Sequence, residues 1–260
     1  MPDREARKVT YVGVYGSEKR SLRGVVPDEG VVTLEVNGKP MVRLMCTPTH
    51  LEDLAVGFLF NEGLIRGMDE VAVVEVCGSG DGVTVWLDHD VDAHGMRSIT
   101  SGCSGGTTFE DLRAAEHRID SARKVAPEQV TALMERLAEA ASLHRRAGGV
   151  HAAALADSEG EDLVCLAEDV GRHNTLDKIA GRCLRRGIPT QGEVLLTSGR
   201  VSSEMVNKAA HMGVPIVVSR TAPTGLSIEL AEAWGMTLVG YTRRKSFRIY
   251  AGERRIAAES

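Results

Sequence analysis

The second half of the chain alternates between amphipathic helical segments and short apolar β-type runs, and this alternation limits the possible folds more than any other feature. The pattern starts with a helix predicted at residues 126–146 and opened by Pro127. Strands that alternate with helices of this length imply crossover connections and a mostly parallel sheet. The segments that follow are strands at 148–157, 162–170, 193–200, 215–223 and 237–243, and helices at 174–187, 202–213 and 226–235.

The first half of the chain has a different sequence pattern and is predicted to be rich in strands. Asn37-Gly38 lies between two β-type runs and indicates a hairpin over residues 30–46, and a helix is predicted over 50–65. A Gly-, Ser- and Thr-rich stretch at 100–112 marks a loop between the halves. We therefore predict a β-rich N-terminal domain at 1–125, ending in the loop that holds Cys103, and an α/β/α domain at 126–260. The element order of the latter is that of the cytidine-deaminase-like fold.

The charge and composition of the chain limit the kinds of partner and the cellular compartment that we expect for it. The 260-residue chain has a net charge of −5, which argues against nucleic acid as its main partner. No apolar run is long enough for a membrane helix, and the first eight residues are charged and lack an apolar signal core. We expect a cytoplasmic protein without membrane or nucleic-acid partners. The five cysteines are odd in number and scattered, which does not suit a disulfide framework.

The cytidine-deaminase-like order raises the question of a zinc site. A zinc deaminase needs H-x-E at one helix start and P-C-x-x-C at the next. Here His173 is followed two residues later by Thr175, and the turn at 197–201 has no cysteine. The chain also has no C-x-x-C pair that would suit structural zinc. We therefore expect no bound metal and no deaminase activity.

Cys103 is the strongest candidate nucleophile. Its neighbours Gly102, Ser104, Gly105 and Gly106 give the thiol a small frame that another sulfur atom can approach closely. The alternative is a Gly-rich linker that happens to contain a cysteine. The other four cysteines have apolar neighbours and are predicted to lie in the core. They are Cys46, Cys77, Cys165 and Cys183.

Several basic residues follow the predicted strands, where open α/β sheets bind ligands. Arg172 and His173 start one helix, and Arg200 and Arg220 follow the next two strands. The segment Val239, Gly240, Tyr241, Thr242, Arg243 and Arg244 ends the last strand and combines an aromatic ring, a hydroxyl and paired arginines. We expect these loops to bring Arg172, Arg200, Arg220 and Arg243 towards one anion, such as a nucleotide phosphate. The alternatives are structural: Asn174 caps the helix while Asp169 pairs with Arg172, and 239–244 is only a charged edge.

Six strings of residues together resemble the FdhD/NarQ family of formate dehydrogenase accessory sulfurtransferases. They follow one another in the order of that family over residues 10–250, and the string from Glu168 to Lys178 is the most specific. The strings are HLEDLAVGFLFNEGLI, TSGC, GGVHAAAL, EDVGRHNTLDKIAG, TSGRVSSEMVNKAA and PIVVSRTAPTGLSIELAEAWGMTLVGYTR.

The resemblance implies a function. Members of the family receive sulfur from a cysteine desulfurase as a cysteine persulfide, and that cysteine corresponds to Cys103. They pass the sulfur to a molybdenum bis-pterin guanine dinucleotide cofactor, bound at the segment that corresponds to 239–244, which then enters the catalytic subunit of formate dehydrogenase. The family commonly forms homodimers. Many members have a second cysteine where this chain has Gly106. The alternative function is a carrier of the cofactor or of a guanine nucleotide, without sulfur transfer.

Overall fold

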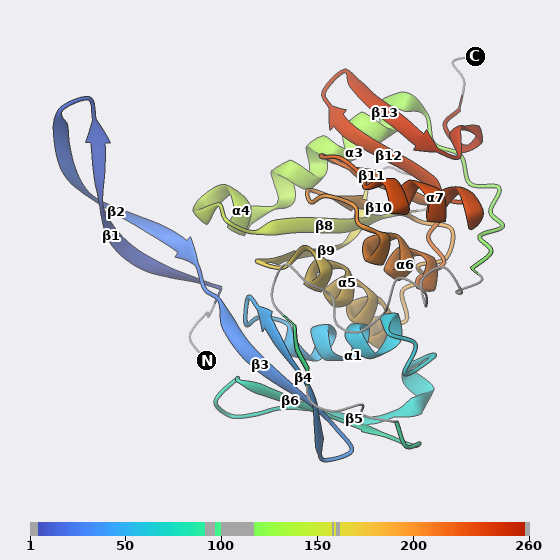
Figure 1. The fold of residues 1–260 in the computed structure, drawn as a ribbon, viewed down its shortest axis with the longest axis horizontal. Coiled ribbons are helices and arrows are strands. Elements are labelled where there is room, and N and C mark those ends of the chain that lie inside the picture. The colour runs from blue at the N-terminus through green and yellow to red at the C-terminus, as the bar shows by residue number, and fades with distance from the viewer. Residues whose placement is uncertain (1–4, 92–96, 100–116, 158, 160–161, 258–260) are drawn as a thin grey trace.

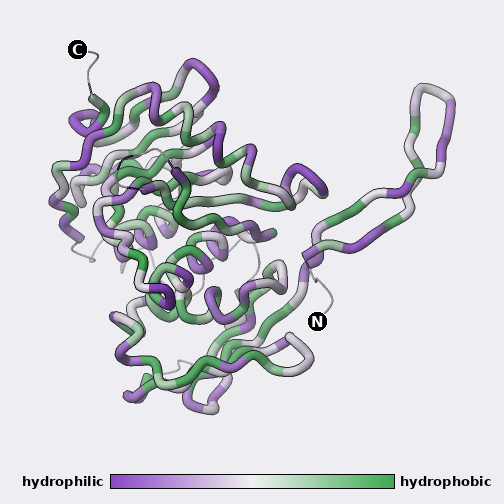
Figure 2. Tube along the Cα trace, turned by 180° about the vertical axis from the view of Figure 1, so that it is seen from behind, coloured by the Kyte–Doolittle hydropathy of each residue, from purple (hydrophilic) through white to green (hydrophobic). Residues whose placement is uncertain are grey.

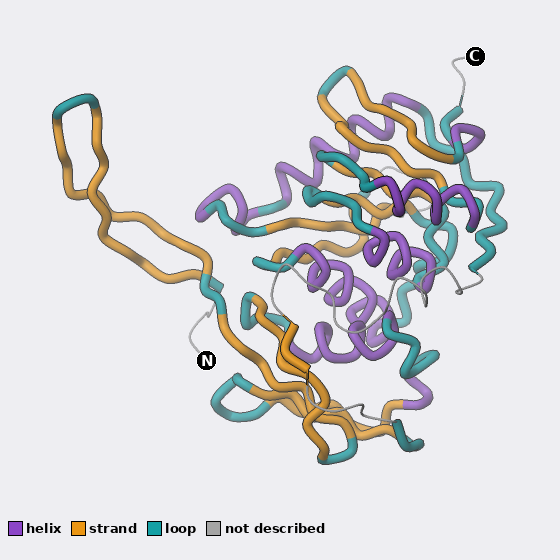
Figure 3. Tube along the Cα trace, in the orientation of Figure 1, coloured by secondary structure: helices purple, strands orange, loops and turns teal. Residues whose placement is uncertain are grey.

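The computed structural model describes residues 5–91, 97–99, 117–157, 159 and 162–257, and Figure 1 shows their arrangement. The described strands form a two-stranded hairpin, a five-stranded sheet and a six-stranded sheet. The two larger sheets lie in different parts of the molecule, with helices between them and on the outer side (Figure 3). The protein is therefore of mixed α/β class.

The chain begins with a hairpin that extends away from the rest of the molecule (Figures 1 and 2). Its strands are β1 (Ala6–Tyr15) and β2 (Glu18–Pro27). A hairpin alone is marginally stable in water, and aromatic rings lying over cross-strand glycines give it support. A Cβ added at Gly24 would lie 2.8 Å from the Tyr11 ring. A Cβ added at Gly13 would lie 2.8 Å from Leu22 of the opposite strand and 2.9 Å from the Tyr15 ring of its own strand.

The five-stranded sheet has the order β5-β6-β3-β4-β7. The predicted hairpin at Asn37-Gly38 is confirmed, with both residues at positive φ between β3 and β4. Helix α1 (Leu51–Asn61) packs its apolar side on this sheet, and a short η1 (Met68–Glu70) follows. The strand bounds are β3 Gly30–Val36, β4 Lys39–Cys46, β5 Val71–Val76, β6 Gly82–Leu87 and β7 Arg97–Ile99.

The six-stranded sheet has the order β13-β12-β11-β10-β8-β9 and forms the middle of three layers. One face packs on α3 (Pro127–Ala140), and the other packs on α5 (Arg172–Arg186), α6 (Ser203–His211) and α7 (Gly225–Ala233). Alternate residues supply the two faces, as Ala153 and Ala154 do in β8. The strands are β8 His151–Ala156, β9 Leu163–Asp169, β10 Val194–Thr197, β11 Ile216–Ser219, β12 Thr237–Arg243 and β13 Ser246–Ala251.

The α/β/α layering agrees with the sequence prediction, but two details differ. Only β10, β11 and β12 are parallel neighbours, because β8, β9 and β13 enter the sheet through antiparallel pairs. The predicted mostly parallel sheet was therefore wrong. The predicted helix at 126–146 is divided at Ala141 into α3 and α4 (Ser142–Ala147). Strand β13, followed by a short η2 (Glu253–Arg255), was not predicted.

Helices α1 and α5 join the two halves by packing directly on each other. A Cβ added at Gly57 in α1 would lie 1.8 Å from the backbone oxygen of Asp177 in α5. One added at Gly181 would lie 1.9 Å from the backbone oxygen of Asp53. Both positions therefore require glycine, because any side chain would push the helices apart.

Residues 117–125 pack on the C-terminal layers. The buried Arg255 donates hydrogen bonds from its guanidinium to the backbone oxygens of Ile119, Ser121 and Gly235, at 3.2, 3.1 and 2.6 Å. Val125 also pairs with Ile256 in a β-bridge. The domain boundary at residue 125 stays a prediction. Among the described residues, no helix is both long enough and apolar enough to span a membrane.

Candidate functional site

The polar residues after the strands gather at one edge of the six-stranded sheet. Because β8 is antiparallel to both β9 and β10, strands β9 to β12 all run in one direction. Their carboxyl ends at Asp169, Thr197, Ser219 and Arg243 therefore meet at the same edge, as the sequence predicted. At this edge the predicted residues form two separate clusters.

The first cluster lies after β9 and β10. Arg172 and His173 open α5, and the Arg172 side chain packs over Gly199, where an added Cβ would lie 3.1 Å from the Cβ of Arg172. The same added atom would lie 3.2 Å from the Nδ1 atom of His151. Arg200 is exposed, and its charge is one of those that lower the pKa of His173. The arrangement brings two cations and two imidazoles together.

His173 is buried in a way that keeps its ring neutral. Its Nε2 atom lies 3.1 Å from the Ser202 hydroxyl and 3.3 Å from a carboxylate oxygen of Glu204. Burial, and then the nearby charges of Arg172 and Lys208, lower the pKa of His173 to about 3. Burial also raises the pKa of Glu204. A neutral imidazole is therefore expected at pH 7, available as a hydrogen-bonding group rather than as a cation.

This burial predicts a pH dependence of stability. A histidine whose folded pKa lies below its unfolded value stabilises the protein fully above about pH 6.5, and the stabilisation is lost as the pH falls towards 3. From pH 7 to pH 5, His173 should lower the free energy of unfolding by about 2 kcal/mol. Urea titrations of the wild type and of His173→Gln at both pH values measure this. An equal pH dependence in the two proteins would show that the pKa of His173 is the same in the folded and unfolded states.

The second cluster is a surface cavity of 470 Å³, which we call the arginine groove. Arg220, Arg243 and Arg244 line one side, and Met134, Glu135, Ala138 and Glu139 of α3 line the other. Backbone oxygens position two of the guanidinium groups, since the carbonyl of Thr242 accepts from Arg220 at 3.3 Å and from Arg243 at 3.0 Å. Arg244 forms a 3.2 Å ion pair with Glu135. Three of the predicted basic residues thus share one groove, whereas Arg172 and Arg200 lie beside His173.

Only some of the side chains in the segment 239–244 line the groove. Val239, Gly240 and Thr242 are buried, and Val239 belongs to the core shared with α3. Tyr241 is 37% exposed and has a φ of 52°, an uncommon left-handed conformation for a bulky residue. The guanidinium of Arg248 lies 4.3 Å from the centre of its ring. The pairing of β12 with β13 is irregular between Gly240 and Arg243, next to this residue.

The segment from Glu168 to Lys178 mainly holds the two halves of the chain together. The buried Asp169 carboxylate accepts hydrogen bonds from the Thr47 and Gly171 backbone amides and from the Asn174 side chain, and it lies 2.6 Å from the ammonium of Lys178. The predicted alternative in which Asn174 caps the helix and Asp169 pairs with Arg172 is therefore wrong. Both side chains instead tie the strand-to-helix turn to residues 45–49.

A second buried ion pair lies further along the same helices. Lys208 of α6 lies 2.7 Å from the Asp177 carboxylate, which also accepts a 2.7 Å hydrogen bond from Asn61 of α1. Breaking such a pair by removing one partner typically costs about 3–5 kcal/mol. Three helices are thereby fixed relative to one another.

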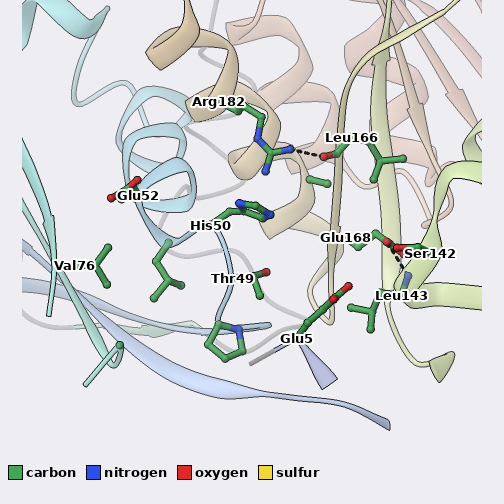
Figure 4. Close-up of a pocket in the computed structure, with 14 residues that line it drawn as sticks. Glu5, Thr49, His50, Glu52, Val76, Ser142, Leu143, Leu166, Glu168 and Arg182 are labelled. Atoms are coloured by element: carbon green, nitrogen blue, oxygen red, sulfur yellow. Dashed lines mark hydrogen bonds between the residues drawn. The ribbon is translucent and has the colours of Figure 1, made fainter. Parts of the chain in front are cut away.

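A cavity of 710 Å³ lies between the two halves (Figure 4). His50, just before α1, has a left-handed φ of 53° and lies between Arg182 and Thr49, while Glu168 lies across the cavity beside Ser142 and Leu143. Arg182 bonds to Asp53 at 2.9 Å and to the backbone oxygen of Leu166 at 2.7 Å. Arg182 in the wall of this cavity is therefore already paired with groups of the protein.

A family model identifies the chain. The model of the FdhD/NarQ family matches residues 27–257. The chain belongs to the FdhD/NarQ family. Two relatives described as sulfur carrier protein FdhD are those of Bacillus subtilis and Bacillus pumilus, which are 39% and 40% identical. The alignments cover 86% of this chain and 87% of the first relative, and 89% and 90% for the second.

A solved structure is similar to this FdhD/NarQ chain throughout. It is a protein from Desulfotalea psychrophila assigned as a formate dehydrogenase accessory protein. Its TM-score is 0.83 at 26% identity, over 97% of this chain and all of that one. The fold described above is therefore shared within the family.

The cysteines of this FdhD/NarQ chain differ in exposure. Cys103 lies outside the described residues. Cys46, Cys165 and Cys183 are buried, as predicted, and burial together with Asp169 raises the pKa of Cys46 to about 12. Cys77 is exposed at the turn after β5, so its predicted place in the core was wrong. In the described part of the chain, no group of three or more His, Cys, Asp or Glu side chains is placed to hold a metal ion.

Sequence reasoning missed Glu135 and Glu139, which line the arginine groove. Both lie on the polar face of an amphipathic helix, where carboxylates are common and usually only solvated. Nothing in their spacing marks them. Only the packing of α3 beside the ends of β11 and β12 brings them next to arginines more than 80 positions away in the sequence.

Proposed function

We propose that this chain is a sulfurtransferase that carries sulfur as a persulfide on Cys103 and serves formate dehydrogenase. The observation that carries the proposal is the family match, together with relatives at 39–40% identity described as sulfur carriers. A cysteine desulfurase is the proposed donor, and the catalytic subunit of formate dehydrogenase is the proposed recipient of the finished cofactor. The protein is proposed to act in the cytoplasm as a homodimer.

The proposed transfer is a thiol–persulfide exchange. The thiolate of Cys103 attacks the terminal sulfur of the donor's persulfide, a new S–S bond forms, and the donor's cysteine leaves as a thiolate. The terminal sulfur of the Cys103 persulfide is then passed on to the substrate, a molybdenum bis-pterin guanine dinucleotide cofactor. The S–S bond breaks, Cys103 leaves as a thiolate, and a thiol reductant supplies the two electrons that bring the transferred sulfur to the sulfide level. The small residues on both sides of Cys103 would allow both partners to approach closely.

The arginine groove suits the guanosine phosphate end of such a substrate. Its 470 Å³ volume lies within the range of small-molecule sites, and its three guanidinium groups suit phosphate oxygens. Arg172, His173 and Arg200 are proposed to contact another part of the same large cofactor, at the same sheet edge. These residues belong to the chain itself, so binding at the groove can be tested with a nucleotide fragment alone.

A reconstitution experiment tests sulfur delivery. The protein is loaded by a desulfurase with cysteine, freed of both, and added to formate dehydrogenase that carries unsulfurated cofactor. Formate dehydrogenase activity should rise with loaded protein and should not rise with unloaded protein. Equal activation by both forms would instead favour a carrier of the cofactor that transfers no sulfur.

We expect Arg243→Ala to weaken GDP binding. The side chain is exposed, so the lost charge-assisted contact should correspond to about a 10-fold lower affinity, at the low end for such contacts. Calorimetric titration at low salt measures this. Arg172→Ala is the matched control, because Arg172 lies outside the groove and should leave GDP affinity within about twofold. Unchanged affinity in both variants would place the nucleotide site elsewhere.

A further inference from the structure

The arginine groove contains carboxylates that a simple phosphate site would not have. Glu135 and Glu139 lie one helical turn apart on α3 and face the side lined by Arg220, Arg243 and Arg244. Ala138 and the largely buried Met134, also one turn apart, supply the apolar part of the wall beside the two carboxylates. The groove thus presents cations, an apolar strip and anions within one 470 Å³ cavity.

This mixture selects against ligands that carry only negative charge. Two carboxylates repel a bare diphosphate and offset part of the attraction of three guanidinium groups. A ligand that suits the whole groove therefore has an anionic end for the arginines, a flat apolar face, and hydrogen-bond donors for a carboxylate. A nucleotide whose base presents donors meets all three requirements.

The two carboxylates have different surroundings. Glu135 already forms the ion pair with Arg244. The exposed Glu139 carboxylate forms no hydrogen bond or ion pair with any residue that the structure describes, although it lines the same groove as three arginines. Glu139 therefore keeps both oxygens available as hydrogen-bond acceptors.

We propose that Glu139 reads the guanine base of the bound nucleotide. The edge of guanine presents its N1–H and its 2-amino group side by side, so both can donate to the two oxygens of one carboxylate. Adenine presents an unprotonated N1 at the same position, and its lone pair would face the carboxylate. This assignment rests on the proposed function, because it concerns the substrate of the same groove, and it gives that groove its base specificity.

The test compares GDP, IDP and ADP by calorimetric titration of the wild type and two variants. Hypoxanthine in IDP keeps N1–H and lacks the 2-amino group, so it separates the two proposed hydrogen bonds. Glu139→Ala removes the proposed reader. Glu135→Ala is the matched control, because it removes the same charge one helical turn away on the same helix.

The informative quantity is the ratio of GDP affinity to ADP affinity, since loss of a negative charge should change phosphate attraction equally for both nucleotides. We expect the wild type to bind GDP about 10-fold or more tightly than ADP, with IDP between them. Glu139→Ala should bring the ratio close to one, whereas Glu135→Ala should keep the wild-type ratio.

Each contrary result has a distinct meaning. If the wild type binds GDP and Glu139→Ala keeps the full preference for guanine, the assignment of Glu139 is overturned while the nucleotide site stands. If both variants lose the preference equally, charge rather than a specific contact sets it, and the assignment also fails. If the wild type does not bind GDP at all, both the assignment and the proposed cofactor site are refuted.

Discussion

Replacing Cys103 with alanine is expected to reduce sulfur delivery to the level seen without the protein. The reason is chemical: the proposed transfer passes through a covalent persulfide, and alanine has no atom that can carry it. The reconstitution of formate dehydrogenase activity with desulfurase-loaded protein measures the loss. Far-ultraviolet circular dichroism and the urea midpoint should match those of the wild type, which would separate lost chemistry from lost folding.

Cys77→Ala is the matched control for this loss. Cys77 is the exposed cysteine among the described residues, so a desulfurase could reach it as readily as any surface thiol. This variant should keep full sulfur delivery. If Cys77→Ala abolished delivery and Cys103→Ala did not, the carrier cysteine would be the one at the turn after β5.

Gly57→Ala is expected to destabilise the fold by about 3 kcal/mol or more, at the upper end for overpacked cores. The added methyl group would meet the backbone oxygen of Asp177 at 1.8 Å, and backbone atoms cannot turn aside as a flexible side chain can. The helices must separate, which would strain the bonds of Asp169 and Lys178 that cross the same junction. Urea unfolding measures the change.

Gly78→Ala supplies the comparison for Gly57→Ala. A Cβ added at Gly78 would meet no atom within 4 Å, and its φ is not among the positive ones. Its effect should stay within about 0.5 kcal/mol, as for most surface substitutions. A similarly small effect for Gly57→Ala would mean that α1 and α5 do not pack as closely as the structure shows.

The elements with strong local signals were predictable from the sequence. Asn37-Gly38 fixes its hairpin through the positive φ that both residues adopt, and the helix–strand alternation yields the three layers. The direction of each strand was harder to predict, because the sequence of a β-type run does not show whether the strand pairs parallel or antiparallel with its neighbours. Antiparallel entry of β8 depends on how it pairs with β10, about 40 residues later.

The site residues show why a motif does not reveal its role. Arg243 and Asp169 are each the last residue of a strand, and both are the kinds of residue found at ligand sites. Arg243 lies in the groove, whereas Asp169 is fully buried and holds Lys178. The two residues differ in burial. Asp169 is buried because residues 45–61, which lie more than 100 positions earlier in the sequence, pack on α5. Glu139 was missed for the opposite reason, since an exposed helical glutamate carries no local signal.

The most direct test of sulfur carriage by this chain is peptide mass spectrometry after incubation with a cysteine desulfurase and cysteine. The exposed thiols are blocked by an alkylating reagent that preserves persulfides before digestion. The peptide containing Cys103 is expected to gain the mass of one sulfur atom, whereas the Cys77 peptide is expected to gain none. Extra sulfur confined to Cys46, Cys77, Cys165 or Cys183, or absent from every peptide, would contradict this expectation.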